Sequence, residues 1–170
     1  MKLKYVKRFA QFERMSQYGE EWRPGESDVN PLSNRLTPEF VEELQPNEVF
    51  VFGSNLQGVH TAGARHYKSA ASSAIEKGWA DSNQVEGISR SGKAYAIPTQ
   101  SNRQPLPLDE IKKYVDNFFK YAKQNPNKKF LVTMIGSGYS DQDKITMAKM
   151  FSPAVEMGNV HLPWPYVKRI

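Results

Sequence analysis

The stretch from Val49 to Tyr67, VFVFGSNLQGVHTAGARHY, places small and polar residues directly behind a run of strand-forming residues. Its glycines, Gly53, Gly58 and Gly63, would let a ligand approach the backbone closely, because a glycine has no Cβ atom and readily adopts positive φ. In open α/β sheets, ligands bind outside the carboxyl ends of the strands, where unpaired backbone N–H groups suit phosphate oxygens. The stretch therefore predicts a site for a phosphate-bearing ligand.

Two further stretches end in residues of the same kind. Gly136 and Gly138 follow the apolar run KKFLVTM, and Pro98 and Thr99 close the apolar run KAYAIPT. Because the carboxyl ends of neighbouring parallel strands meet at one sheet edge, we expect all three stretches to line one cleft. Neither glycine stretch matches the G-x-G-x-x-G fingerprint of dinucleotide-binding folds or the G-K-[ST] ending of a P-loop.

Asn55 and His60 are the side chains in the first stretch that offer chemistry. His60 either polarises a ribose hydroxyl or a water molecule, or bonds to the backbone as many loop histidines do. Asn55 either has a catalytic or ligand-binding role or forms an Asx-type turn. Three scattered histidines and no cysteine make no metal-binding set, so we expect no metal and no cofactor. No pairing of a nucleophile with a base is evident.

The elements that must position these residues follow from the apolar patterns. Helices are expected at 62–77, from Leu108 to Lys123 with apolar residues at spacings of three and four, and more weakly at 144–157 around Pro153. Short apolar runs that read as strands buried on both faces lie at 48–52, 93–99, 128–135 and 159–163. Strands that alternate with helices predict a three-layer α/β/α fold with a mixed, mostly parallel sheet.

A short helix is also expected in LTPEFVEEL. Thr37 has the character of an N-cap, Pro38 suits the first helical position, and Phe40, Val41 and Leu44 would share one face. We expect residues 1–36 to form an N-terminal arm or extension and residues 37–170 to form a single α/β domain.

Composition narrows the function class. The chain has 170 residues, a net charge of +5 and no apolar run long enough to span a bilayer. The basic residues are spread along the chain rather than gathered into one run, so sequence-specific nucleic-acid binding is not expected, whereas a mild positive field favours an anionic small ligand. The N-terminus lacks the pattern of a secretory signal, so a cytoplasmic location and no membrane association are expected.

The strings VFVFGSNLQGVHTAGA, AYAIPT and FLVTMIGSGYSD resemble a macro-domain-like family of small bacterial and phage proteins, over residues 38–163. The resemblance implies that two glycine-rich loops hold the diphosphate of ADP-ribose, with Asn55 reaching the distal ribose. Thr61 stands where the family favours Gly, and Ser137 stands where it favours Cys. The ligand-binding residues expected on all these grounds are Gly53, Ser54, Asn55, Gly58, His60, Ala62, Gly63, Ala64, Pro98, Thr99, Gly136, Ser137, Gly138 and Tyr139.

Two functions of different classes remain open from the sequence. In the first, the domain binds ADP-ribose or a related nucleotide, with or without hydrolysis of an ADP-ribosyl bond by a water molecule held near Asn55 and His60. In the second, it is a non-catalytic module whose basic, aromatic N-terminal arm contacts a protein partner or RNA, and its glycines only form tight turns.

Overall fold

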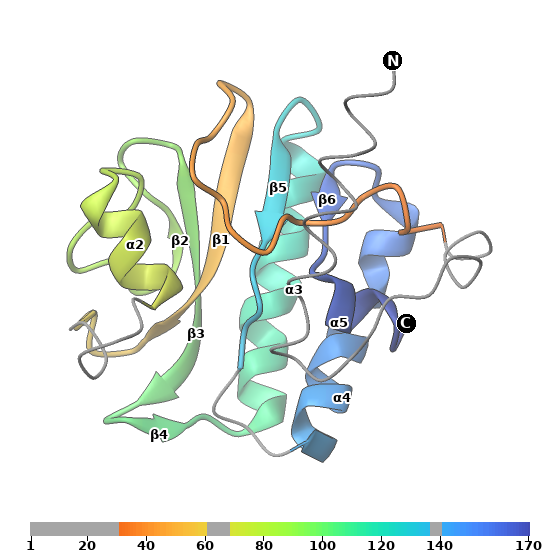
Figure 1. The fold of residues 1–170 in the computed structure, drawn as a ribbon. Coiled ribbons are helices and arrows are strands. Elements are labelled where there is room, and N and C mark those ends of the chain that lie inside the picture. The colour runs from red at the N-terminus through yellow and green to blue at the C-terminus, as the bar shows by residue number, and fades with distance from the viewer. Residues whose placement is uncertain (1–30, 61–68, 137–140) are drawn as a thin grey trace.

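The computed structural model describes residues 31–60, 69–136 and 141–170 (Figure 1). The described part has a central six-stranded sheet in the order β2-β3-β1-β5-β6, with β4 paired to β3. The strands are β1 (Glu48–Asn55), β2 (Gly87–Ile88), β3 (Ala94–Ser101), β4 (Gln104–Pro105), β5 (Lys129–Val132) and β6 (Val160–His161). Strand β1 runs parallel to both β3 and β5, and β5 runs parallel to β6, whereas β2 and β4 are antiparallel to β3. The expectation of a mixed, mostly parallel sheet is confirmed.

Helices cover both faces of this sheet. They are α2 (Ala70–Glu76), α3 (Leu108–Gln124), α4 (Asp141–Met150), the 3-10 helix η2 (Ser152–Glu156) and α5 (Trp164–Val167). Helix α2 lies on one face, and α3, α4 and α5 lie on the other (Figure 1). None of the helices in the described ranges combines the length and apolar character needed to cross a bilayer.

Alternation along β1 divides the core into two hydrophobic clusters. Val49 and Val51 belong to the larger cluster, which includes the buried face of α3, whereas Phe50 and Phe52 belong to the smaller cluster under α2. Successive side chains of a strand point to opposite faces, so a strand covered on both sides must be apolar at every position. This is why the uninterrupted apolar run VFVF, residues 49–52, forms the centre of the sheet.

The helix predictions hold to different degrees. Helix α3 matches its expected span and buries the side chains at its apolar spacing. Helix α2 begins only at Ala70, because Ser69 is extended (φ −66°, ψ 157°) and its hydroxyl accepts a hydrogen bond from the Ser72 N–H as an N-cap. The segment expected as a weak helix at 144–157 is α4 followed by η2, which contains Pro153. Residues 62–68 of the expected helix 62–77 lie outside the described residues.

The expected helix in LTPEFVEEL is wrong. The Thr37 N–H donates to the Leu162 carbonyl (2.9 Å), and the Thr37 hydroxyl donates to the His161 carbonyl (2.9 Å), so the chain here runs extended beside the end of β6. Phe40, which a helix would have buried, is 60% exposed. Pairing with a distant segment satisfies the backbone groups that a first helical turn would leave open, and it overrides the local capping signal.

The described end of the expected N-terminal arm packs on the domain. Leu32 is fully buried in the larger cluster. The Arg35 guanidinium donates to the carbonyl oxygens of Ala154, Val155 and Met157 around η2. Residues 31–36 are therefore part of the folded unit, and residues 1–30 lie outside the described part of the chain.

Candidate ligand-binding site

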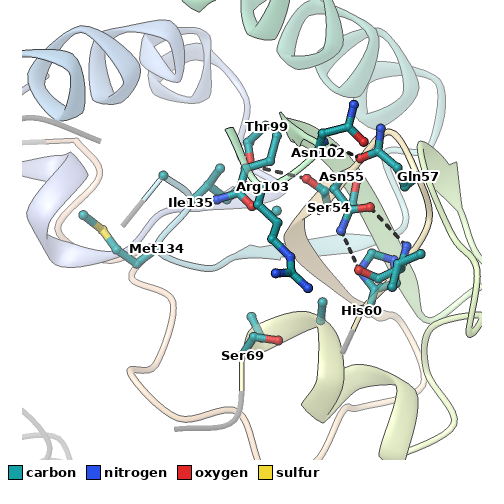
Figure 2. A pocket seen from close by; sticks show the side chains of 16 residues that line it. Ser54, Asn55, Gln57, His60, Ser69, Thr99, Asn102, Arg103, Met134 and Ile135 are labelled. Atoms are coloured by element: carbon teal, nitrogen blue, oxygen red, sulfur yellow. Dashed lines mark hydrogen bonds between the residues drawn. The ribbon is translucent and has the colours of Figure 1, made fainter. Parts of the chain in front are cut away.

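A pocket of about 540 Å³ opens at the carboxyl ends of β1, β3 and β5 (Figure 2). Its described lining comes from the end of β1 (Gly53, Ser54, Asn55), the following loop (Gln57, Val59, His60), the start of α2 (Ser69, Ala70, Ala71), the end of β3 (Thr99, Gln100), the β3–β4 turn (Asn102, Arg103) and the segment after β5 (Met134, Ile135, Gly136). The three sequence stretches expected to meet at one sheet edge do meet there.

Gly53 keeps the base of this pocket open. A Cβ atom at this position would lie 3.4 Å from Thr99 Oγ1 and 3.5 Å from Ile135 Cγ2, so any larger side chain would occupy the space between those two residues. Gly136, on the other wall, has φ +81°, a conformation that L side chains rarely adopt. Both glycines therefore leave their backbone atoms accessible to a ligand at the sheet edge where the sequence predicts the site.

Asn55 closes the loop that follows β1. Its Nδ2 donates to the Val59 carbonyl (2.7 Å), and its Oδ1 accepts a hydrogen bond from the Val59 N–H (3.1 Å). The Asn55 carbonyl also accepts from the Gly58 N–H (3.1 Å). Of the two interpretations left open for Asn55, the turn-forming one is what the geometry displays, although the residue also lines the pocket.

His60 and Ser54 are both anchored to the chain just before β2. His60 Nε2 lies 2.7 Å from the Gln84 carbonyl oxygen, so this nitrogen carries the proton, and the ring packs edge-on against Phe52 with centroids 6.0 Å apart. The Ser54 hydroxyl donates to the Val85 carbonyl. The anchoring of His60 agrees with the backbone-bonded interpretation of a loop histidine.

Two of the expected ligand-binding residues do not line the pocket that the described residues form. Gly58 has φ +62° and lies close to the backbone of Asn83, because a Cβ atom at residue 58 would come within 2.6 Å of the Asn83 carbonyl oxygen. Pro98 lies buried within β3 opposite Ser54. Gly58 therefore serves the shape of the loop, and Pro98 serves the sheet.

Six other expected residues lie outside the described residues. They are Ala62, Gly63 and Ala64 in the first stretch and Ser137, Gly138 and Tyr139 in the second. Their part in ligand binding stays a prediction.

Sequence reasoning missed the β3–β4 turn. Ser101 pairs with Gln104, and the two residues between them, Asn102 and Arg103, have φ values of 48° and 64°. Positive φ at both central positions is the signature of the type I′ hairpin turn, for which Asn-Gly is the usual sequence. The string NRQP carries Asn at the first central position but Arg at the second, so the turn signal was weak and the approach of Arg103 to the pocket was not apparent.

The described lining of the pocket carries charge of one sign only. Arg103 is the charged residue among the described lining residues, which include neither Asp nor Glu. The described residues also contain no cluster of His, Cys, Asp and Glu suited to a metal ion. The lining thus favours an anionic ligand by electrostatics alone.

The most perturbed titratable groups lie away from this lining. Burial raises the pKa of Tyr95 to about 12, and burial also raises the pKa of Tyr166, whereas burial together with the charge of Lys129 lowers the pKa of His161 to about 4. All three are in the sheet or the core beneath it, and none lines the pocket. Perturbed pKa values mark catalytic acids and bases when they occur in clefts, and here they reflect burial.

Comparison with protein-family models, with curated proteins and with solved structures found no match to this chain.

Proposed function

We propose that the domain binds ADP-ribose or a related phosphate-bearing nucleotide in the pocket at the carboxyl ends of β1, β3 and β5. The observation that carries the proposal is the lining itself. Two glycines, Gly53 and Gly136, expose backbone beside one cation, Arg103, and no described lining residue is an acid. The volume of about 540 Å³ lies within the usual range of small-molecule sites.

The lining also suits the uncharged part of a nucleotide. Met134 and Ile135 give the pocket an apolar wall, and Val59, which is 57% exposed, lies at its rim. The side-chain amides of Gln100 and Asn102 supply donors and acceptors near the other wall. A ligand with a flat apolar ring, ribose hydroxyls and phosphates would find a partner for each part.

Binding has more support than hydrolysis. A water molecule attacking an ADP-ribosyl bond needs a base or a set of precisely placed polar groups. Asn55 is hydrogen-bonded to Val59 within its own loop, His60 is hydrogen-bonded to Gln84 before β2, and the described lining offers no carboxylate base. We therefore propose binding as the function and leave to experiment whether Asn55 and His60 also orient a water. The alternative module with an N-terminal arm that binds a partner or RNA rests on residues 1–30, and it gives the pocket no role.

Calorimetric titration of the full chain with ADP-ribose tests the proposal. We expect saturable binding that Gly53→Val weakens at least about tenfold, because the added side chain would fill the space between Thr99 and Ile135. Gly158→Val is the matched control, since a Cβ atom at Gly158 meets nothing within 4 Å. Absence of ADP-ribose binding by the parent chain, or equal affinity of the parent and Gly53→Val, would contradict the proposal.

Hydrolysis has a separate test. The chain is incubated with a mono-ADP-ribosylated peptide, and released ADP-ribose is measured by chromatography, for the parent and for His60→Ala. Release by the parent that His60→Ala abolishes, with ADP-ribose affinity unchanged, would assign a catalytic role to His60.

A further inference from the structure

Arg103 occupies a backbone conformation that an arginine normally avoids. Its φ of 64° follows a φ of 48° at Asn102, in the two-residue turn between β3 and β4. For residues with a Cβ atom this region is strained, and Gly, Asn and Asp are the residues that usually occupy both central positions of such a turn. Strained backbone persists where the surrounding structure enforces it, and it is concentrated at binding and catalytic sites.

Gln57, from the loop after β1, lies beside this turn and bonds to it (Figure 2). Its Oε1 accepts a hydrogen bond from the Asn102 N–H (2.8 Å), and its Nε2 donates to Ser101 Oγ (3.1 Å). One side chain from the loop after β1 thus bonds to two consecutive residues of the β3–β4 turn. These bonds fix the backbone position of the turn, and with it the direction in which the side chain of the following residue, Arg103, extends.

The side chain of Arg103 extends from the turn into the pocket, toward the side where Ser69 caps α2 (Figure 2). Within the part of the chain that the structure describes, no carboxylate forms an ion pair with it. Arg103 is thus held in a strained turn by a second side chain and directed into a pocket whose described lining has no acid, so the described residues give it no counter-ion. A ligand anion would supply it.

We propose that Arg103 is the residue that recognises the phosphate groups of the ligand, and that Gln57 is the residue that positions it. The inference rests on the proposed function for the identity of the whole ligand, but the anion contact itself can be measured with inorganic pyrophosphate. The planar guanidinium donates two parallel hydrogen bonds to phosphate oxygens, which a lysine ammonium does not.

The binding test is a calorimetric titration with pyrophosphate, ADP-ribose and adenosine. We expect Arg103→Gln to weaken binding of both phosphate ligands by about ten- to a hundredfold, the range of a charge-assisted hydrogen-bonded contact, and to leave adenosine binding unchanged. Arg103→Lys should recover part of the loss, because it restores the charge without the planar fork. Arg90→Gln is the matched control, since Arg90 is an exposed arginine away from the pocket and its loss changes the net charge equally.

A second variant separates recognition from fold stability. Arg103→Gly should raise the melting temperature by about 2–4 °C, because glycine adopts positive φ without strain, while it weakens pyrophosphate binding as much as Arg103→Gln does. A residue with only a structural role would not change affinity and stability in opposite directions.

The positioning role of Gln57 is tested by a double-mutant cycle. Gln57→Leu removes both bonds to the turn and should weaken pyrophosphate binding by about three- to tenfold in the parent. The same substitution should have almost no effect on binding when Arg103 is already Gln, because Gln57 then has no cation to position. Equal effects in both backgrounds would show that Gln57 does not act through Arg103.

The outcomes distinguish the two proposals. If ADP-ribose binds the parent and Arg103→Gln equally, the assignment of Arg103 is overturned and the proposed function stands. If the parent binds pyrophosphate through Arg103 but does not bind ADP-ribose, the assignment stands and the proposed ligand is wrong. If the parent binds neither ligand, both are overturned.

Discussion

Gly58→Ala tests whether this glycine shapes the loop or contacts the ligand. A Cβ atom at residue 58 would lie 2.6 Å from the Asn83 carbonyl oxygen and 3.3 Å from Val85 Cγ2, with φ at +62°. A backbone oxygen cannot rotate away as a side chain can, so the segment containing Asn83 and Val85 has to move.

The expected cost has two parts. Positive φ costs an L residue about 1–2 kcal/mol relative to glycine. Displacing residues 83–85 also strains the bonds that Ser54 and His60 make to the carbonyls of Val85 and Gln84, each worth about 0.5–1.5 kcal/mol. We therefore expect Gly58→Ala to lower the free energy of unfolding by about 2–4 kcal/mol.

Gly78→Ala is the matched control, because Gly78 has φ +70° and a Cβ atom there would meet nothing within 4 Å. Gly78→Ala should lower the free energy of unfolding only by the cost of positive φ, about 1–2 kcal/mol. The assay is urea unfolding followed by circular dichroism. The urea midpoints of two variants are compared only if the free energy of unfolding falls with urea concentration at the same slope in both. Equal destabilisation by the two substitutions would refute the contact with Asn83 and would leave Gly58 available as a ligand residue.

Two other substitutions test the loop and the sheet. Asn55→Ala should lower the free energy of unfolding by about 1–2 kcal/mol, because Asn55 closes the loop through Val59. For the same reason it should weaken ADP binding and ADP-ribose binding by the same factor. Selective loss of ADP-ribose binding would instead assign Asn55 to the distal ribose. His161 has its pKa lowered to about 4 by burial and by the charges of Lys129 and Arg35, against the opposing effects of a backbone hydrogen bond at Leu36 and the charge of Glu48. Below a pH of about 6.5 the unfolded chain binds a proton that the folded chain does not, so this contribution to stability is complete above that pH and is lost progressively toward pH 4. Urea unfolding between pH 7 and pH 4.5 should show a shallower pH dependence for His161→Gln than for the parent, and an unchanged dependence would contradict the assignment to His161.

The strands and the long helix were predictable because local pattern and tertiary context agree there. The apolar spacing from Leu108 to Ala122 needs a helix to gather its side chains on one face, and α3 does so against β3 and β5. The runs at β1, β3 and β5 are too uniformly apolar for any position but the middle of a covered sheet. The shared sheet edge followed from the same argument.

The errors arose where a local signal competed with distant partners. Thr37 and Pro38 read as a helix start, but the Thr37 hydroxyl and N–H bond to residues of the β6 segment. Gly58 read as part of a phosphate loop, although its contact is with Asn83, which no periodicity links to it. Arg103 was missed because its position depends on the turn geometry and on Gln57, both of which require the fold to be known.

The pairing of Leu36 and Thr37 with the end of β6 can form only late in folding, after the C-terminal part of the domain has been synthesised. The Thr37 hydroxyl and its acceptor at His161 are 124 positions apart, so the bond cannot form until most of the described chain has been made. At typical synthesis rates that interval lasts about 6–25 s. Until then Leu36 has no Leu162 to pair with, and closing such a long loop is slow compared with forming α3. We therefore expect the segment around Leu36 to lack its partner for seconds during synthesis, long enough for a chaperone, or a second nascent copy, to bind it first.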